Sequence, residues 1–307
     1  MASRFGTVLV GGGSGFIGSA LSKVLRTAGY DVITVSRKPG VWQITWEDLA
    51  SDGLPDNCVA VVSLAGQNIL DPRRRWTPGF KQNVWASRVN TTKSLADAIQ
   101  NTKTPPEVFA TISGVGYYKP CQETEYTENS SGGDHDFLAE LCRKWESAGN
   151  LPPELPVRRV IVRSGVVLGR HGGMIQQMFW PFYLGFGGPI SSGTQYLPWI
   201  HLDDIVGIFF HAISNGHVSG ILNGVAPQVI TNSDFTKAFS RAMWRPAIIP
   251  VPKFALNLAF DKERAVIMTE GQKVVPKRTL EVGYKYKYPD IQSACKNLAR
   301  LIYVDQM

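Results

Sequence analysis

The feature that most constrains the fold of this chain is a glycine-rich turn with the spacing Gly12-x-x-Gly15-x-x-Gly18. It follows a β-branched apolar run, Thr7–Val10, and precedes a segment with apolar residues at helical spacing. In this context the first two glycines let backbone approach a pyrophosphate, and the third permits close packing of helix on sheet. The helix N-terminus adds N–H donors. The expected contacts are Gly12, Gly15, Phe16, Ile17 and Gly18. The alternative is a tight turn without a ligand.

Strands and helices alternate along the first half of the chain. Short runs rich in β-branched residues predict strands, and a longer amphipathic run predicts a helix over Asn83–Ile99. The strands expected after the first are Asp31–Ser36, Val59–Leu64, Val108–Ser113 and Arg159–Arg163. Such alternation forms right-handed βαβ units, so we predict an α/β fold with a doubly wound parallel sheet of the Rossmann type.

The composition changes after Gly169, where aromatic residues, glycine and proline become frequent. We predict a dinucleotide-binding domain over residues 1–169 and a smaller C-terminal substrate lobe over 170–307, with a segment near 198–225 returning to the first domain. The helices expected in the lobe are Ser233–Met243, Lys253–Phe260 and Ile291–Leu301. The alternation in Tyr284–Tyr288 is typical of an edge strand. Asp203 and Asp204 are expected to cap a helix.

The residues after the second expected strand discriminate between the two nicotinamide cofactors. An acidic residue there would bind the adenosine ribose hydroxyls of NAD(H) and repel a 2′-phosphate. The sequence has Ser36, Arg37 and Lys38 instead, a hydroxyl and two cations that can bind this phosphate through charge-assisted hydrogen bonds. We therefore predict NADP(H) as the cofactor. The alternative is a solvated basic loop.

The charge balance favours an anionic small molecule as the ligand. The chain has 32 Lys and Arg against 25 Asp and Glu, a formal net charge of +7. Apart from Arg73–Arg75 the bases are dispersed and no aromatic nucleic-acid motif accompanies them, so we expect no nucleic-acid partner. No apolar run reaches the roughly 18 residues of a membrane helix, and no cysteine or histidine spacing suggests a metal site. We expect no membrane partner, no metal and a cytoplasmic location, with a mitochondrial matrix left open.

Several motifs carry a resemblance to a known family. The glycine turn, Ser63–Gly66 and Trp199–Asp204 resemble those of the extended short-chain dehydrogenases/reductases of the NAD-dependent epimerase/dehydratase type. Within that superfamily, other segments resemble the branch called epimerase family protein, among them Gly114–Tyr118, Arg163–Gly169 and Glu270–Pro276. The resemblance spans nearly the whole chain and implies a homodimer.

The resemblance also implies which side chains meet the cofactor. Leu64, Ala65 and Gly66 would back the adenine and the nicotinamide-side ribose. A strand end of small residues is also where a doubly wound sheet opens its ligand crevice. Arg88 stands where the family usually has an Asn, which implies a cofactor or phosphate contact, and the alternative is a charge on the helix surface. Arg163, at the end of its strand, is expected to be a second cation in this crevice.

The catalytic residues depart from the family pattern. The family uses a Ser or Thr to orient the substrate oxygen, a Tyr as acid/base and a Lys one helical turn later, and Ser113 matches the first role. Leu138 and Cys142 stand at the Tyr and Lys positions, so the Tyr-x-x-x-Lys motif is absent. Tyr117 or Tyr118 could supply the hydroxyl, although a tyrosine pair after a strand is also typical of packing.

Two functions of different classes are therefore expected. The first is an NADP(H)-dependent oxidoreductase that exchanges hydride with a small carbonyl or alcohol substrate. The second is a non-catalytic NADP(H)-binding protein, structural or redox-sensing, because the fold alone does not establish a reaction.

Overall fold

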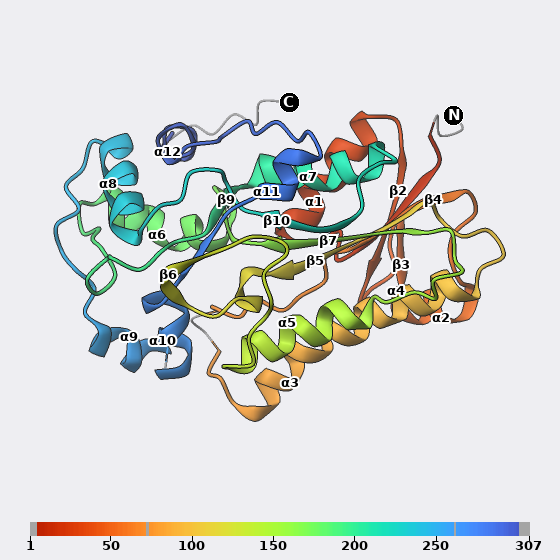
Figure 1. Cartoon of the computed structure of the whole chain (residues 1–307), viewed down its shortest axis with the longest axis horizontal. Coiled ribbons are helices and arrows are strands. Elements are labelled where there is room, and N and C mark those ends of the chain that lie inside the picture. Colours follow the sequence, from red (N-terminus) through yellow and green to blue (C-terminus); the bar gives the residue numbers. More distant parts are fainter. Residues whose placement is uncertain (1–4, 72–73, 261, 301–307) are drawn as a thin grey trace.

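The central sheet has seven parallel strands in the order β10-β7-β5-β4-β1-β2-β3 (Figure 1). The computed structural model describes residues 5–71, 74–260 and 262–300. The strands of this sheet are β1 (Thr7–Gly11), β2 (Asp31–Ser36), β3 (Gln43–Thr45), β4 (Cys58–Ser63), β5 (Val108–Gly114), β7 (Arg158–Ser164) and β10 (Gly220–Gly224). The predicted doubly wound Rossmann sheet is confirmed, and its order reverses beside β1, where such folds bind ligands.

Helices cover both faces of the sheet, which explains why the central strands β1, β4 and β5 are buried almost throughout. Side chains of β1 alternate between two clusters: Val8 and Val10 share one with Leu21 of α1, whereas Leu9 shares the other with Leu95 of α4. One face carries α1 (Phe16–Thr27) and α7 (Leu202–Ser214), and the other carries α2 (Trp46–Asp52), α4 (Val89–Asn101) and α5 (Phe137–Ala148) (Figure 1).

The predicted helix over Asn83–Ile99 is two helices, α3 (Pro78–Ala86) and α4. The break lies at Ser87 and Arg88, where the Ser87 hydroxyl accepts a hydrogen bond from the Gln67 N–H at 2.9 Å. The Arg88 guanidinium donates to the Gln67 carbonyl at 2.9 Å. These bonds tie the break to the segment after β4, a contact distant in sequence that helical periodicity does not reveal.

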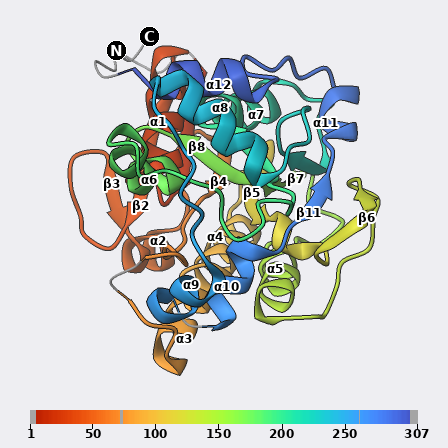
Figure 2. The same cartoon turned by 90° about the vertical axis from the view of Figure 1, so that its left-hand side faces the viewer.

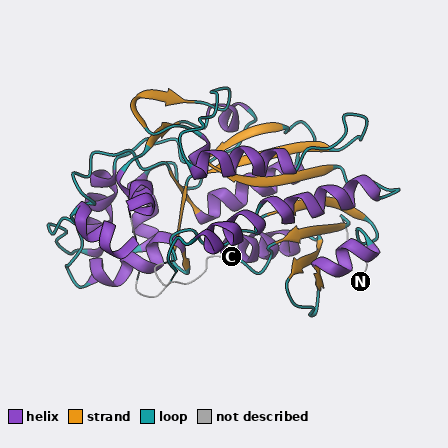
Figure 3. Ribbon diagram, turned by 90° about the horizontal axis from the view of Figure 1, so that it is seen from below, coloured by secondary structure: helices purple, strands orange, loops and turns teal. Residues whose placement is uncertain are grey.

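A second core lies at the other end of the molecule. There α6 (Gly173–Tyr183), α8 (Asn232–Met243) and α12 (Ile291–Leu298) pack through Phe179, Phe182, Phe235, Phe239 and Leu298. Figure 2 looks onto this end, and Figure 3 shows its helices gathered away from the main sheet. The remaining elements are η1 (Val115–Tyr117), α9 (Lys253–Phe260), α10 (Lys262–Thr269), α11 (Lys277–Glu281), and two strand pairs, β6 (Cys121–Tyr126) with β11 (Gln272–Val274) and β8 (Val166–Gly169) with β9 (Trp199–His201).

The helices predicted in this part correspond to α8, α9 and α12, and the predicted helix end Leu301 lies outside the described residues. The prediction of an edge strand over Tyr284–Tyr288 is wrong, because this segment does not pair with any strand of the described residues. It bonds instead to the Asp204 carboxylate, with the Tyr284 hydroxyl at 3.0 Å and the Lys287 N–H at 2.7 Å. None of the helices in the described ranges has the length and apolar character needed to cross a bilayer.

Candidate functional site

The glycine turn between β1 and α1 is closely packed and leaves the start of α1 open. Gly12 has φ +82°, and a Cβ there would lie 2.6 Å from the Ala65 nitrogen. Gly15 is the N-cap of α1, and a Cβ on it would meet only the Gly12 carbonyl oxygen, at 3.2 Å. The N-terminal N–H groups, Phe16 and Ile17 included, carry the positive end of the helix dipole, and the first turn has no acidic residue. The turn thus fits a diphosphate, as expected for Gly12–Gly18.

The segment after β4 completes this edge of the sheet. The Leu64 N–H donates to the Gly11 carbonyl at 2.8 Å, which places Ala65 against Gly12. A Cβ on Gly66 would lie 3.1 Å from the Arg88 Cζ. The structure therefore brings Leu64, Ala65 and Gly66 to the glycine turn at the carboxyl edge of the strands.

A cavity of about 380 Å³ opens beside this segment. Its described lining residues include two arginines and no acidic residue, and they are Arg37, Gln67, Arg74, Phe80, Asn83, Ala86 and Ser87. Of the three residues predicted to select NADP(H), Arg37 lines the cavity. The Ser36 hydroxyl bonds within its own turn, donating to the Lys38 carbonyl at 2.6 Å, and the Lys38 side chain is exposed. The cavity has the size and charge for the phosphate-bearing end of a nucleotide.

Arg88 is mostly enclosed behind the wall of this cavity. Its guanidinium donates to the carbonyls of Gln67 and Val84, and its Cζ lies 5.1 Å from the centre of the Trp145 ring. Burial lowers the pKa of Arg88 to about 10. Within the described residues it forms no ion pair with a carboxylate, so a bound anion would stabilise it. Arg88 is thus no simple charge on the helix surface.

Ser113 lies next to the carboxyl end of β5 with 3% of its surface exposed. Its hydroxyl makes no hydrogen bond of good geometry to any described residue. The adjoining Gly114 lies against α5, where a Cβ would be 3.6 Å from the Cys142 sulfur. Burial raises the pKa of Cys142 to about 11, although the Ser113 hydroxyl lowers it. Cys142 is therefore a neutral packing residue, and Ser113 has a free capacity for a hydrogen bond.

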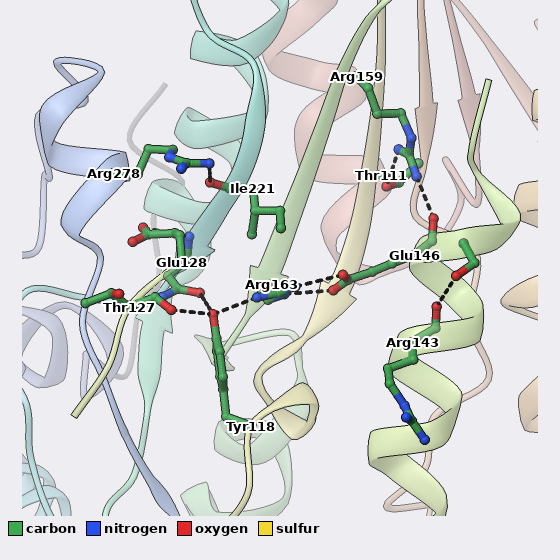
Figure 4. A network of polar contacts seen from close by, with 12 residues as sticks. Thr111, Tyr118, Thr127, Glu128, Arg143, Glu146, Arg159, Arg163, Ile221 and Arg278 are labelled. Carbon is green, nitrogen blue, oxygen red and sulfur yellow. Dashed lines mark hydrogen bonds and ion pairs between the residues drawn. The ribbon is translucent and has the colours of Figure 1, made fainter. Parts of the chain in front are cut away.

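Tyr118 and Arg163 belong to a buried network, drawn in Figure 4, that contradicts their expected roles. Two nitrogens of Arg163 donate to the two carboxylate oxygens of Glu146 at 2.8 and 2.9 Å, and a third donates to the Tyr118 hydroxyl at 2.9 Å. That hydroxyl also lies 2.9 Å from the Asn223 Oδ1 and 3.1 Å from the Thr127 carbonyl. Burial raises the pKa of Tyr118. The predictions of Arg163 as a cofactor contact and Tyr118 as a proton donor are thus corrected, because both groups are used internally.

Tyr117 has a different environment from its neighbour. Its ring is half-buried, stands edge-on to Tyr118 at 5.3 Å, and has the Arg163 guanidinium 3.4 Å from its centre. Across the described part of the chain, no group hydrogen-bonds to its hydroxyl. Of the tyrosine pair, Tyr117 is the one whose hydroxyl is not held by a hydrogen bond to a described residue, and its ring packs against Gly132, where a Cβ would lie 2.5 Å from the Tyr117 Cζ.

Sequence reasoning missed Arg74, Gln67 and Asn83 as cavity residues and Glu146 as the partner of Arg163. Arg74 belongs to the basic run Arg73–Arg75, and this clustering could have indicated an anion-binding residue. Nothing in the sequence around Gln67 and Asn83 indicated a cavity. Arg73 itself lies outside the described residues. The described residues contain no group of three or more His, Cys, Asp or Glu side chains that could hold a metal ion.

Comparisons with known proteins agree with the geometry. Residues 8–223 match the sequence pattern of the NAD dependent epimerase/dehydratase family, and residues 251–298 match a domain of unknown function, DUF1731. Epimerase family protein SDR39U1 of Bos taurus is 52% identical over 292 residues, which cover 95% of this chain and 99% of that one. Epimerase family protein YfhF of Bacillus subtilis is 32% identical over 295 residues, covering 94% and 96%.

The same similarity holds in three dimensions. The crystal structure of human epimerase family protein SDR39U1 (isoform 2) with NADPH superposes with a TM-score of 0.94 at 50% identity. The match covers 96% of this chain and 100% of the human one.

Proposed function

Because the chain belongs to the NAD-dependent epimerase/dehydratase family, we propose that it is an NADP(H)-dependent oxidoreductase acting on a small carbonyl or alcohol substrate. The cofactor part is supported by the human relative crystallised with NADPH and by the cavity lined by Arg37. The catalytic part rests on one observation, the buried Ser113 hydroxyl, which makes no hydrogen bond of good geometry to a described residue and has the Cys142 thiol beside it. A buried hydroxyl left unpaired costs about 1–3 kcal/mol, which a hydrogen bond to a bound substrate oxygen would offset.

The residues of the chain have distinct roles in this proposal. The N–H groups at the start of α1 bind the diphosphate, and Arg37 binds the 2′-phosphate. When bound, the nicotinamide would supply or accept the hydride. Ser113 donates a hydrogen bond to the substrate carbonyl oxygen and orients it. Tyr117 donates the proton to that oxygen during reduction, and its half-buried ring leaves it open to recover a proton from water.

The cofactor assignment is tested by titrating the purified chain with NADPH and NADH in a calorimeter. Wild-type protein should bind NADPH more tightly, and Arg37→Glu should lose this preference because a carboxylate repels the 2′-phosphate. Equal binding of both cofactors by wild-type protein would contradict the predicted NADP(H) specificity.

The reaction is tested by following NADPH consumption against a panel of aldehydes and ketones. Ser113→Ala and Tyr117→Phe should each lower kcat by about 10²-fold, the usual contribution of one oxygen-binding donor or one general acid. NADPH affinity should stay the same in both variants. Tyr30→Phe is the matched control, because Tyr30 precedes β2 at the opposite edge of the sheet. Unchanged turnover in Ser113→Ala and Tyr117→Phe would refute these roles.

A second function is favoured by one observation, the buried Cys142 beside Ser113, where the family usually has a Lys. On this alternative the chain binds NADP(H) without turnover, as a structural or redox-sensing protein. Tight NADPH binding with no consumption against any carbonyl, and a partner protein captured only by the nucleotide-loaded chain, would support it over the oxidoreductase.

A further inference from the structure

Two neighbouring residues of α10 reach across to the nucleotide-binding half of the chain. Glu263 forms an ion pair with Lys81 of α3 at 2.6 Å. Arg264, 1% exposed, donates hydrogen bonds to the backbone carbonyls of Asp71, at 2.8 Å, and of Arg74. In Figure 2, α10 lies between α9 and α5 and above α3, so these contacts join segments far apart in sequence.

These contacts hold two walls of the arginine-lined cavity. Phe80, Asn83 and Ala86 of α3 form one wall, and Lys81 of the same helix is the residue held by Glu263. Arg74 belongs to another wall, and its backbone is held by Arg264. Since α10 lies within residues 251–298, the C-terminal region takes part in shaping the cavity.

The charge of the cavity favours an anionic ligand. Arg37 and Arg74 both line one space whose described lining has no acidic residue, so an anion bound there would gain from both positive charges. Arg37 follows β2, the position at which a doubly wound fold holds the adenosine ribose. A phosphate on that ribose is therefore the anion that both arginines can reach.

We propose that Arg74 is a second ligand of the 2′-phosphate beside Arg37, and that Arg264 is the positioning residue for Arg74. This inference rests on the proposed NADP(H) binding. The guanidinium of Arg264 fixes the carbonyls of Asp71 and Arg74, which sets the backbone from which the Arg74 side chain extends. Discrimination between NADP(H) and NAD(H) thus depends on a residue of the C-terminal region that does not touch the cofactor.

The first experiment measures the contribution of Arg74 by calorimetry with two probes, adenosine 2′,5′-bisphosphate and 5′-AMP. Arg74→Met should weaken binding of the bisphosphate about 10- to 100-fold, the value of one charged hydrogen-bonding partner, and leave 5′-AMP binding unchanged. Arg75→Met is the matched control, an adjacent exposed arginine outside the cavity lining. Equal bisphosphate affinity in Arg74→Met and Arg75→Met would overturn the proposal.

The second experiment tests Arg264 as a positioning residue. Arg264→Met should weaken bisphosphate binding selectively, and Arg264→Lys, which keeps one donor group near the carbonyls, should recover part of it. In the double variant with Arg74→Met the two losses should not add, because both act through one contact. A loss that is equal for bisphosphate and 5′-AMP, or fully additive losses, would overturn the positioning role.

The outcomes also separate this inference from the proposed function. If wild-type protein binds neither NADPH nor the bisphosphate, both are overturned. If wild-type protein prefers the bisphosphate to 5′-AMP and Arg74→Met keeps the full preference, the inference fails while NADP(H) binding stands. Arg74 is exposed, so its replacement tests the proposal even where Arg264→Met does not fold.

Discussion

Arg163 of β7 and Glu146 of α5 form a buried ion pair between the strand and the helix. Their side chains are 2% and 11% exposed. Glu146 raises the pKa of Arg163 against the effect of burial, so the guanidinium stays charged. The same guanidinium bonds to the Tyr118 hydroxyl (Figure 4). That hydroxyl in turn bonds to the Asn223 side chain of β10. One cation thus joins α5, β7, β10 and the segment after η1.

Removing one partner of this pair should be costly. Glu146→Ala leaves Arg163 buried without a counter-charge, and we expect the free energy of unfolding to fall by about 3–5 kcal/mol. The matched control is Asp97→Ala, which removes the exposed pair Lys93–Asp97, separated by 2.9 Å, and should cost less than about 1 kcal/mol. Urea unfolding followed by circular dichroism measures both. Equal losses in the two variants would contradict the structural role of the buried pair.

Individual site residues could be predicted from the sequence where their role depends on neighbours close in the chain. The glycines of the turn are required by backbone contacts within the turn and with Ala65, so their spacing predicts their place. The orientation of Arg163 depends on Glu146, which lies on a separate helix. Nothing in the sequence next to Arg163 specifies that partner, which is why its expected place in the crevice was wrong.

The start of α7 depends on a histidine. The sequence suggested Asp203 and Asp204 as caps, but the His201 Nδ1 accepts the Asp203 N–H at 3.1 Å and Asp204 serves the segment Tyr284–Tyr288. The His201 Nε2 lies 3.2 Å from the Asn297 Oδ1 and therefore carries the proton. Helical elements were predictable from periodicity, whereas this cap and the break between α3 and α4 depend on contacts distant in sequence.

This cap should make stability depend on pH. Burial lowers the pKa of His201, although Asp203 and Asp204 oppose this, so the unfolded chain takes up the proton first as the pH falls below about 6.5. Stability is therefore retained above that pH and lost below it, by at most about 1.4 kcal/mol per pH unit. Asp204 contributes with the opposite sign, because burial raises its pKa.

The comparison that isolates His201 uses urea midpoints at about pH 7.5 and about pH 5.5, on either side of its unfolded-state pKa. His201→Asn keeps a capping oxygen without a titrating group, so its midpoint should fall less between the two values. An identical fall in wild-type and variant protein would show that His201 does not contribute to the dependence.

At the scale of the whole molecule, the C-terminal region packs onto the main sheet through polar contacts. The Asn223 amide donates to the Val275 carbonyl at 2.9 Å, and the Tyr286 hydroxyl donates to the Val225 carbonyl at 2.8 Å. The sequence predicted the sheet well, because strand and helix periods alternate. The sequence did not predict the contacts of Asn223 and Tyr286. The C-terminal lobe was recognised only from its amino-acid composition, which does not indicate which residues touch the sheet.

We expect the whole chain to unfold in one cooperative transition. The contacts of Asn223 and Tyr286 join the C-terminal region to β10 and the residue after it, so one region cannot open without exposing polar groups of the other. Tryptophan fluorescence and far-ultraviolet circular dichroism should give the same urea midpoint. Two separate midpoints would mean that the lobe opens independently of the sheet.

The brace that Glu263 and Arg264 provide also bears on how this chain can diversify. Every glycine of the dinucleotide turn lies near the start of the sequence, whereas this brace lies near its end. Exchanging only the C-terminal segment between two relatives would then change the strength of 2′-phosphate binding in a chimera whose glycine motif and cavity arginines are untouched. Recombination of the C-terminal segment would therefore tune cofactor affinity while leaving the glycine motif intact.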